Sequence, residues 1–186
     1  MKRFFDLVLG LVVLLVLLIP ILLVTVAVKL TSKGPALYWS DRVGVNNVLF
    51  KMPKFRSMRT GTPAVATHLL TDPSRYLTPI GNFLRKSSLD ELPQLWSIIA
   101  GDMSFVGPRP ALFNQADLIE LRTAEGVHLI RPGLTGWAQV NGRDELPIPV
   151  KVGYDAYYAR NMNVFFDLKI LFLTALKVIK RDGVSH

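Results

Sequence analysis

Residues 7–28 read LVLGLVVLLVLLIPILLVTVAV, a run of 22 uncharged residues near the start of the chain. A helix needs about 20 apolar residues to cross the core of a bilayer, so this run is long enough to enter a membrane. It is too long for the apolar part of a cleaved signal peptide, which has roughly 7 to 15 residues. The run therefore predicts a membrane helix.

Both flanks of this run are basic, with Lys2 and Arg3 before it and Lys29 and Lys33 after it. Basic residues mark the cytoplasmic side of a membrane protein, so charge alone favours neither orientation. Pro20 lies near the middle, where it removes a backbone hydrogen bond and is expected to kink the helix. A kinked re-entrant helix, which enters and leaves on one face, accommodates both flanks. A tilted single span and the core helix of a water-soluble protein stay open as alternatives.

The chain has 186 residues, 50% of them hydrophobic, no cysteine and a formal net charge of +8. Disulfide scaffolds and cysteine-based zinc sites are excluded, and the hydrophobic content disfavours disorder. Nearly all of the excess positive charge lies ahead of residue 61, beside the apolar run. We therefore expect anionic or membranous partners, with lipid favoured over nucleic acid.

The rest of the sequence predicts an α+β fold that is mainly helical. Gly34 and Pro35 indicate a turn into a small β-hairpin near the membrane, with strands around residues 36–39 and 48–52. Residues 61–78 lack a period and are expected to form a loop. Helices are expected at residues 80–86, 89–100, 112–125, 150–161 and 164–181. We divide the chain into a membrane segment, residues 1–32, and a compact cytosolic catalytic domain, residues 33–186.

The last predicted helix carries an apolar stripe with a basic rim. Leu168, Phe172, Leu176 and Ile179 recur at spacings of three or four, and Lys169 is one of the flanking basic residues. Such a helix either lies in a membrane interface or packs as a core helix with a solvated basic edge. Both interpretations stay open.

Candidate chemistry is concentrated between residues 85 and 143, since the sequence has no phosphate-binding glycine loop and only isolated histidines. Asp90 and Glu91 come first. A proline is tolerated in the first turn of a helix, so Pro93 predicts that the acidic pair lies at a helix N-terminus. One interpretation is structural, with Asp90 as N-cap or with Ser88 and Glu91 as a capping box.

The catalytic interpretation gives the two carboxylates separate tasks, because adjacent residues on a helix point about 100° apart. One would hold Mg²⁺ together with substrate phosphates, and the other would attack phosphorus to form an acyl-phosphate. Arg85, Arg109 and Arg143 would then clamp the phosphates. Each arginine taken alone is more simply a surface residue or an ion-pair partner.

Several motifs in a fixed order carry a resemblance to a known family. They are KRFFD at residues 2–6 with the apolar run, KFRSM at 54–58, DELPQL at 90–95, GDMSFVGPRP at 101–110 and PGLTGWAQVNGR at 132–143. Together they closely resemble the bacterial sugar transferases known as monotopic polyprenyl-phosphate phosphoglycosyl transferases. The likeness covers essentially the whole chain, whose length is similar to the minimal catalytic form of that family.

This resemblance implies transfer of a sugar 1-phosphate from a UDP-sugar to polyprenyl (undecaprenyl) phosphate with release of UMP, which initiates assembly of an O-antigen, capsule, exopolysaccharide or glycoprotein glycan. It implies that Asp90 is the nucleophile and carries a covalent sugar phosphate, and that Glu91 and Asp90 are the ligands of Mg²⁺. The substrate-binding positions that it implies are Lys54, Arg56, Arg85, Arg109, Arg143 and Asp155.

The resemblance also implies a location and partners. The re-entrant helix would hold the active site at the cytoplasmic face of the bacterial inner membrane, among membrane lipids and downstream membrane glycosyltransferases, without nucleic acid. Ile19 departs from the family, whose members often have serine before the kinking proline, so the hydroxyl that satisfies a freed carbonyl is missing. A different function stays open, namely a non-enzymatic basic module that attaches to membranes and binds lipid or nucleic acid.

Overall fold

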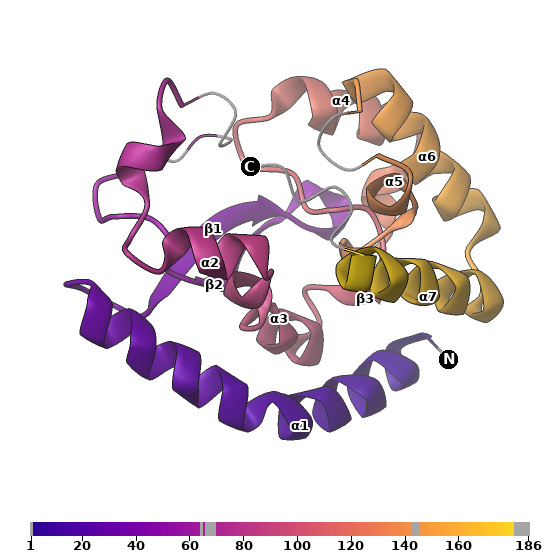
Figure 1. The fold of residues 1–186 in the computed structure, drawn as a ribbon. Helices are drawn as coiled ribbons and strands as arrows, with labels where there is room; N and C mark the ends of the chain where they lie inside the picture. Colours follow the sequence, from indigo (N-terminus) through magenta and orange to yellow (C-terminus); the bar gives the residue numbers. More distant parts are fainter. Residues whose placement is uncertain (1, 64, 66–69, 143–145, 181–186) are drawn as a thin grey trace.

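The computed structural model describes residues 2–63, 65, 70–142 and 146–180 (Figure 1). The fold is a mixture of helices and short strands in which helix predominates, as predicted. The α-helices are α1 (Lys2–Thr31), α2 (Gly81–Lys86), α3 (Gln94–Ala100), α4 (Ala116–Ala124), α5 (Trp137–Val140), α6 (Ile148–Asn161) and α7 (Val164–Lys180). The strands are β1 (Leu37–Val43), β2 (Leu49–Phe55), β3 (Ser104–Val106) and β4 (Gly133–Thr135). Short 3₁₀ helices are η1 (Val45–Asn47), η3 (Pro73–Tyr76), η4 (Leu89–Glu91) and η5 (Val127–Leu129).

The apolar run forms α1, a continuous helix that contains Pro20. Figure 1 shows this helix along one side of the molecule, bent near its middle, with α3 above the bend. It is long enough and apolar enough to cross a membrane by length and composition. Large apolar side chains such as Leu15, Ile19 and Leu23 are exposed on it. An apolar face of this kind is suited to contact with lipid.

The N-terminal end of α1 is tied to the rest of the molecule by polar contacts. Arg3 donates hydrogen bonds to the carbonyls of Ile98 and Ile99 in the last turn of α3, where helix carbonyls lack intrahelical partners. Asp6 is 1% exposed and accepts hydrogen bonds from Ser104 Oγ and Phe105 N of β3. These bonds join α1 to α3, which follows the acidic pair Asp90 and Glu91, and to β3, which precedes Arg109.

The predicted hairpin is present and longer than expected. Strands β1 and β2 pair antiparallel, with Leu37 opposite Phe55 and Val43 opposite Leu49, and η1 lies in the connection. Phe55 is buried with Ala36 in a small apolar cluster that also receives Val28 from the far end of α1. The hairpin therefore packs on the C-terminal half of α1 through the end of β2 and the residue before β1.

A second sheet was not predicted. Strands β3 and β4 pair in parallel, a pairing that the sequence analysis missed because strands of three residues are too short to show an alternating pattern. The contact between them is close, since a Cβ on Gly133 would lie 2.1 Å from the nitrogen of Gly107 and one on Gly136 would lie 2.1 Å from its carbonyl oxygen. The glycines in these two motifs allow the backbones to touch.

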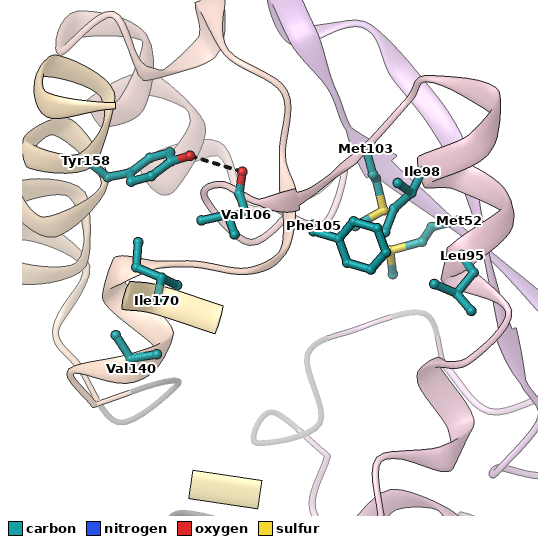
Figure 2. Packing of buried hydrophobic residues seen from close by; sticks show 9 residues of the cluster. All are labelled: Met52, Leu95, Ile98, Met103, Phe105, Val106, Val140, Tyr158 and Ile170. Atoms are coloured by element: carbon teal, nitrogen blue, oxygen red, sulfur yellow. Dashed lines mark hydrogen bonds between the residues drawn. The ribbon is translucent and has the colours of Figure 1, made fainter. Parts of the chain in front are cut away.

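The main core lies between α3, β3, α6 and α7. Figure 2 shows Ile98, Met103 and Phe105 on one side of this core, and the hydroxyl of Tyr158 bonded to the carbonyl of Val106 on the other. The same hydroxyl lies 2.6 Å from Asp167 Oδ1, and Lys2 contacts both groups. Burial is the main cause that raises the pKa of Tyr158, and the bond to Asp167 raises it further. Tyr158 therefore stays protonated and holds α6 against β3.

The helix bounds depart from the expectations in two places. The helix expected at 89–100 is divided into η4 and α3, and the one expected at 112–125 is shortened to α4. In α7, Ile170 is fully buried while Phe165 and Phe172 are exposed. This helix thus has one side in the core and large apolar side chains on another.

Candidate active site

Glu91 is the centre of a contact among three segments that are distant in sequence. Its Oε1 atom accepts hydrogen bonds from Lys54 Nζ and from Arg109 Nη2, both at 2.8 Å. Lys54 comes from β2, Glu91 from η4, and Arg109 from the loop after β3. Three of the residues predicted for the site are therefore brought together by the fold.

The acidic pair does not cap a helix. It lies in η4, a separate 3₁₀ turn before α3, and the N-cap position of α3 is taken by Pro93. Ser88 has a left-handed backbone with φ of 57° and makes no capping hydrogen bond with its side chain. Glu91 uses its carboxylate on Lys54 and Arg109 instead. The capping-box interpretation is therefore wrong.

Asp90 is 8% exposed. Burial raises its pKa, the positive charge of Lys54 acts against that rise, and the negative charge of Glu91 adds to it. Arg85 and Arg109 also lower the pKa, but the net direction is upward. Desolvation disfavours the charged form of a carboxyl group, and this effect dominates here.

Glu91 is shifted in the opposite direction. Burial acts to raise its pKa, but the charges of Arg109 and Lys54 and the hydrogen bonds that they donate hold it well below its usual value. The side chain of Glu91 is 20% exposed. Glu91 therefore remains an anion across a wide pH range, whereas its neighbour Asp90 binds a proton more readily than an ordinary aspartate.

Arg109 is held in place from its backbone as well as from its side chain. The pairing of Gly107 N with Thr135 O and of Gly133 N with Pro108 O fixes the chain on its N-terminal side. Its own carbonyl accepts a hydrogen bond of 2.8 Å from Arg122 Nη1. The position of the guanidinium therefore depends on the second sheet and on α4.

Asp155 acts on the other side of Arg122. It is 1% exposed, and its Oδ2 accepts bonds of 3.0 and 2.6 Å from Arg122 Nε and Nη2. Burial raises the pKa of Asp155, although the charge of Arg122 opposes the shift. The structure therefore places Asp155 behind Arg109, in contact with Arg122 rather than with the acidic pair.

Sequence analysis missed Arg122, although a signal was present. Leu118 and Arg122 are four residues apart and are both buried in α4, so the arginine lies on the same buried side of the helix as an apolar residue. A charge at such a position is unusual unless it is paired. The interruption of the apolar stripe indicates a buried partner elsewhere in the chain.

The structure does not bring Arg56 to the acidic pair. Its guanidinium donates to the carbonyls of Ser32, Lys33 and Pro35, just after α1, and the residue is 5% exposed. Strand β2 ends one residue earlier, so the alternation that would put Arg56 on the same face as Lys54 does not continue. Its position is that of a structural clamp on the end of α1.

Two predicted site residues remain, Arg85 and Arg143. Arg85, the fifth residue of α2, is near enough for its charge to lower the pKa of Asp90. Arg143 lies outside the described residues, so its prediction stays a prediction.

A comparison with known families fits this geometry. The family model of bacterial sugar transferases matches residues 1–181. The chain belongs to the bacterial sugar transferase family. The match includes α1, the hairpin and all the segments that meet at Glu91.

Individual members of this family are similar along nearly the whole chain. An uncharacterized sugar transferase, EpsL, of Bacillus subtilis (strain 168) is 39% identical over 100% of this chain and 91% of its own length. The UDP-glucose:undecaprenyl-phosphate glucose-1-phosphate transferase of Escherichia coli (strain K12) is 39% identical over 95% of this chain. The UDP-galactose-lipid carrier transferase of Erwinia amylovora is 38% identical over 98% of it. The chain spans only 40% and 41% of the length of the last two proteins.

In this sugar transferase, the acidic pair suits one mode of Mg²⁺ binding. Within the described residues, no group of three or more His, Cys, Asp or Glu side chains forms a cage for a metal ion. Mg²⁺ is commonly held by one or two carboxylates while substrate phosphates supply further oxygens. Asp90 and Glu91 are two such carboxylates with basic residues around them, so they fit a metal that arrives with a phosphate substrate.

The support of Arg109 can be tested through its buried ion pair. Arg122→Met leaves Asp155 without a positive partner, and we expect a loss of about 3 kcal/mol in the free energy of unfolding. Arg160→Met is the matched control, since Arg160 pairs with Glu125 at the surface with side chains 68% and 45% exposed. The control should lose less than about 1 kcal/mol.

Thermal unfolding of the full chain in detergent measures both variants. Equal losses in the two would contradict a structural role for Arg122. In the double variant Arg122→Met/Asp155→Leu, most of the stability should return, because no unpaired charge remains buried.

Proposed function

We propose that this chain transfers a sugar 1-phosphate from a UDP-sugar to a polyprenyl phosphate such as undecaprenyl phosphate, and that this reaction initiates the assembly of a glycoconjugate. The observation that carries the proposal is the buried carboxylate of Asp90 beside Glu91, which is held by Lys54 and Arg109. An anionic nucleophile with cations around it suits attack on the diphosphate of a nucleotide sugar. The names of the Escherichia coli and Erwinia amylovora relatives support the same class of reaction.

In the first step, a carboxylate oxygen of Asp90 bonds to the phosphorus next to the sugar. The bond from this phosphorus to the bridging oxygen breaks, and UMP leaves with that oxygen and its electron pair. Catalysis of phosphoryl transfer is mainly positioning and charge stabilisation, so Lys54, Arg85 and Arg109 are assigned to the phosphate oxygens. The raised pKa of Asp90 preserves its basicity, and the step needs Asp90 in its ionised form.

In the second step, a phosphate oxygen of the polyprenyl acceptor attacks the same phosphorus. The bond to Asp90 breaks and returns the carboxylate, which leaves a polyprenyl diphosphate sugar as the product. No oxidant, reductant or net water is consumed. Splitting the transfer in two lets both substrates use one set of cations in turn.

Mg²⁺ is proposed at Glu91 and Asp90, where it would neutralise charge on the pyrophosphate of the donor. Glu91 is the main candidate because its lowered pKa keeps it ionised. In the structure Lys54 and Arg109 both contact Oε1 of Glu91. Binding of a phosphate substrate would give these two cations a second anionic partner, which suits a site that exchanges contacts as substrate enters.

The proposed location is the cytoplasmic face of the bacterial inner membrane, with α1 as a re-entrant helix. A straight helix of 30 residues is about 45 Å long, more than a bilayer core of about 30 Å. Yet contacts to one domain occur near both of its ends: Asp6 bonds to β3, and the residues after Thr31 bond to Arg56. A perpendicular span would carry part of that domain into lipid. A bent helix with both ends at one face of the membrane keeps the whole domain out of the lipid.

The covalent step can be tested by mass. The purified chain, given Mg²⁺ and a panel of UDP-sugars without acceptor, should gain the mass of one sugar phosphate and release UMP. Asp90→Asn should show no adduct and lose about 10³-fold or more in transfer rate, because it lacks the nucleophile. Asp117→Asn, an exposed aspartate on α4, is the matched control and should retain the adduct.

Full turnover in Asp90→Asn would refute the mechanism. If the wild-type chain formed no adduct and transferred no sugar phosphate, yet bound anionic vesicles with a steep dependence on salt, the non-enzymatic lipid-binding module would be favoured. The mass of the adduct also identifies the class of sugar.

The metal assignment predicts a change in the Mg²⁺ requirement. Glu91→Gln should raise the Mg²⁺ concentration for half-maximal adduct formation by about tenfold, because an amide is a weaker ligand than a carboxylate. Glu120→Gln, an exposed glutamate on α4, is the control. An unchanged Mg²⁺ requirement in Glu91→Gln would remove Glu91 from the metal site.

The orientation of α1 can be tested by labelling, because the chain has no native cysteine. One cysteine is added ahead of Met1, and others replace Lys33 or Glu120 in separate variants. In intact cells an impermeant maleimide should label none of them, and all three should react after permeabilisation. Labelling of the N-terminal cysteine alone in intact cells would indicate a single span.

A further inference from the structure

A mostly apolar groove of about 600 Å³ lies between α1, the hairpin and the η4–α3 segment. Its walls come from the bent membrane helix on one side and from the hairpin and α3 on the other. All three elements contribute to its lining, which includes Ile21, Thr25, Leu37, Pro53, Leu92 and Leu95. The volume is within the range of sites that hold a small organic ligand.

Two lining residues of this groove are adjacent in sequence to residues of the candidate active site. Pro53 lines the groove and is followed by Lys54, while Leu92 lines it and is preceded by Glu91. The two residues that form the Lys54–Glu91 ion pair are therefore each one position away from a groove residue. A molecule in the groove could reach the cations of the site without leaving the protein surface.

The groove is accessible from the side on which α1 would meet lipid. Trp96 is 62% exposed and Trp39 is 48% exposed, although both line the groove. Lys29 carries the one charge among the lining side chains that the structure describes. Such a surface excludes a polar ligand such as a nucleotide sugar and favours a hydrocarbon chain that enters sideways from the membrane.

We propose that this groove holds the part of the acceptor's isoprenoid chain that lies next to its phosphate. The inference rests on the proposed function and assigns a chain-binding site to it. With the chain along Leu92 and Pro53, the phosphate at its end lies beside Lys54 and Arg109, where the second step takes place. A phospholipid could fill the groove with an acyl chain, but only the acceptor must place its terminal phosphate at Asp90 for transfer.

Filling the groove from α1 tests this assignment. Thr25→Trp puts a bulky side chain into the groove, whereas Val26→Trp, at a neighbouring position that is 55% exposed and does not line it, is the matched control. We expect Thr25→Trp to lower kcat/KM for undecaprenyl phosphate about tenfold, mainly by raising KM. A loss of this size corresponds to a few methylene groups of the acceptor that are no longer buried. Val26→Trp should change it less than about twofold, as expected for an exposed position.

Two further readouts separate the groove from the chemistry. In Thr25→Trp the loss for farnesyl phosphate should be similar to the loss for undecaprenyl phosphate, because both acceptors carry the same isoprene units next to the phosphate. Adduct formation from the UDP-sugar alone should fall far less than acceptor transfer. An unchanged KM for undecaprenyl phosphate in Thr25→Trp, or an equal loss in adduct formation and transfer, would overturn the assignment.

A measurement on the unaltered chain does not depend on how the variants fold. Undecaprenyl phosphate that carries a diazirine in the isoprene units next to its phosphate is photolysed with the protein in nanodiscs. Crosslinks are expected in peptides that contain Trp39, Pro53 or Trp96. An excess of unlabelled undecaprenyl phosphate should abolish them, and dioleoyl phosphatidic acid, which offers the same phosphate on acyl chains, should not.

Equal competition by phosphatidic acid, or crosslinks confined to other peptides, would overturn the proposal. The failure of the proposed function has a different signature. In that case the wild-type chain would form neither the Asp90 adduct nor the diphosphate product, whatever the crosslinks show.

Discussion

The candidate site depends on the way in which the first turns of α1 hold α3 and β3 together. Arg3 donates hydrogen bonds to the carbonyls at the end of α3, and Asp6 accepts a hydrogen bond from β3. Strand β3 begins only a few residues after α3 ends. The acidic pair comes immediately before α3, and Arg109 comes shortly after β3. A charged side chain at a helix C-terminus and a buried carboxylate with two donors are both stabilising arrangements. The first turns of α1 therefore connect the two segments that carry Glu91 and Arg109.

The two carboxylates of the site are separated in function by their surroundings. Asp90 is more deeply buried and has a raised pKa, whereas Glu91 accepts the hydrogen bonds of Lys54 and Arg109 and has a lowered pKa. Pairs of acidic groups whose environments push their pKa values apart commonly have different tasks. The more basic carboxylate suits bond formation to phosphorus, and the permanently ionised one suits binding of cations.

Local sequence patterns predicted the parts of the fold that such patterns determine. The apolar run, the hairpin, and the acidic pair near a helix start were all legible from residue type and spacing. The parallel sheet was not, because it is formed by two triplets whose strongest signal is the glycines that permit close contact. Lys54 and Arg56 illustrate the limit most clearly. The motif predicts that both residues bind substrate, yet Lys54 contacts Glu91 and Arg56 binds the carbonyls after α1. The two side chains diverge because β2 ends at Phe55, between them.

The basic residues near the start of the chain thus act in more than one way. Arg3, near the start of α1, donates to backbone carbonyls of α3, and Arg56 donates to backbone carbonyls just after the end of α1. Lys54 is part of the site itself. Arg56 follows Lys54 by two residues, so the clamp on the far end of α1 is continuous with a cation of the site. At the near end of α1, Asp6 bonds to β3, and the chain continues from β3 to Arg109, the other cation. A change in the bend of α1 would therefore alter the positions of both cations that hold Glu91, so this helix contributes to the geometry of the site.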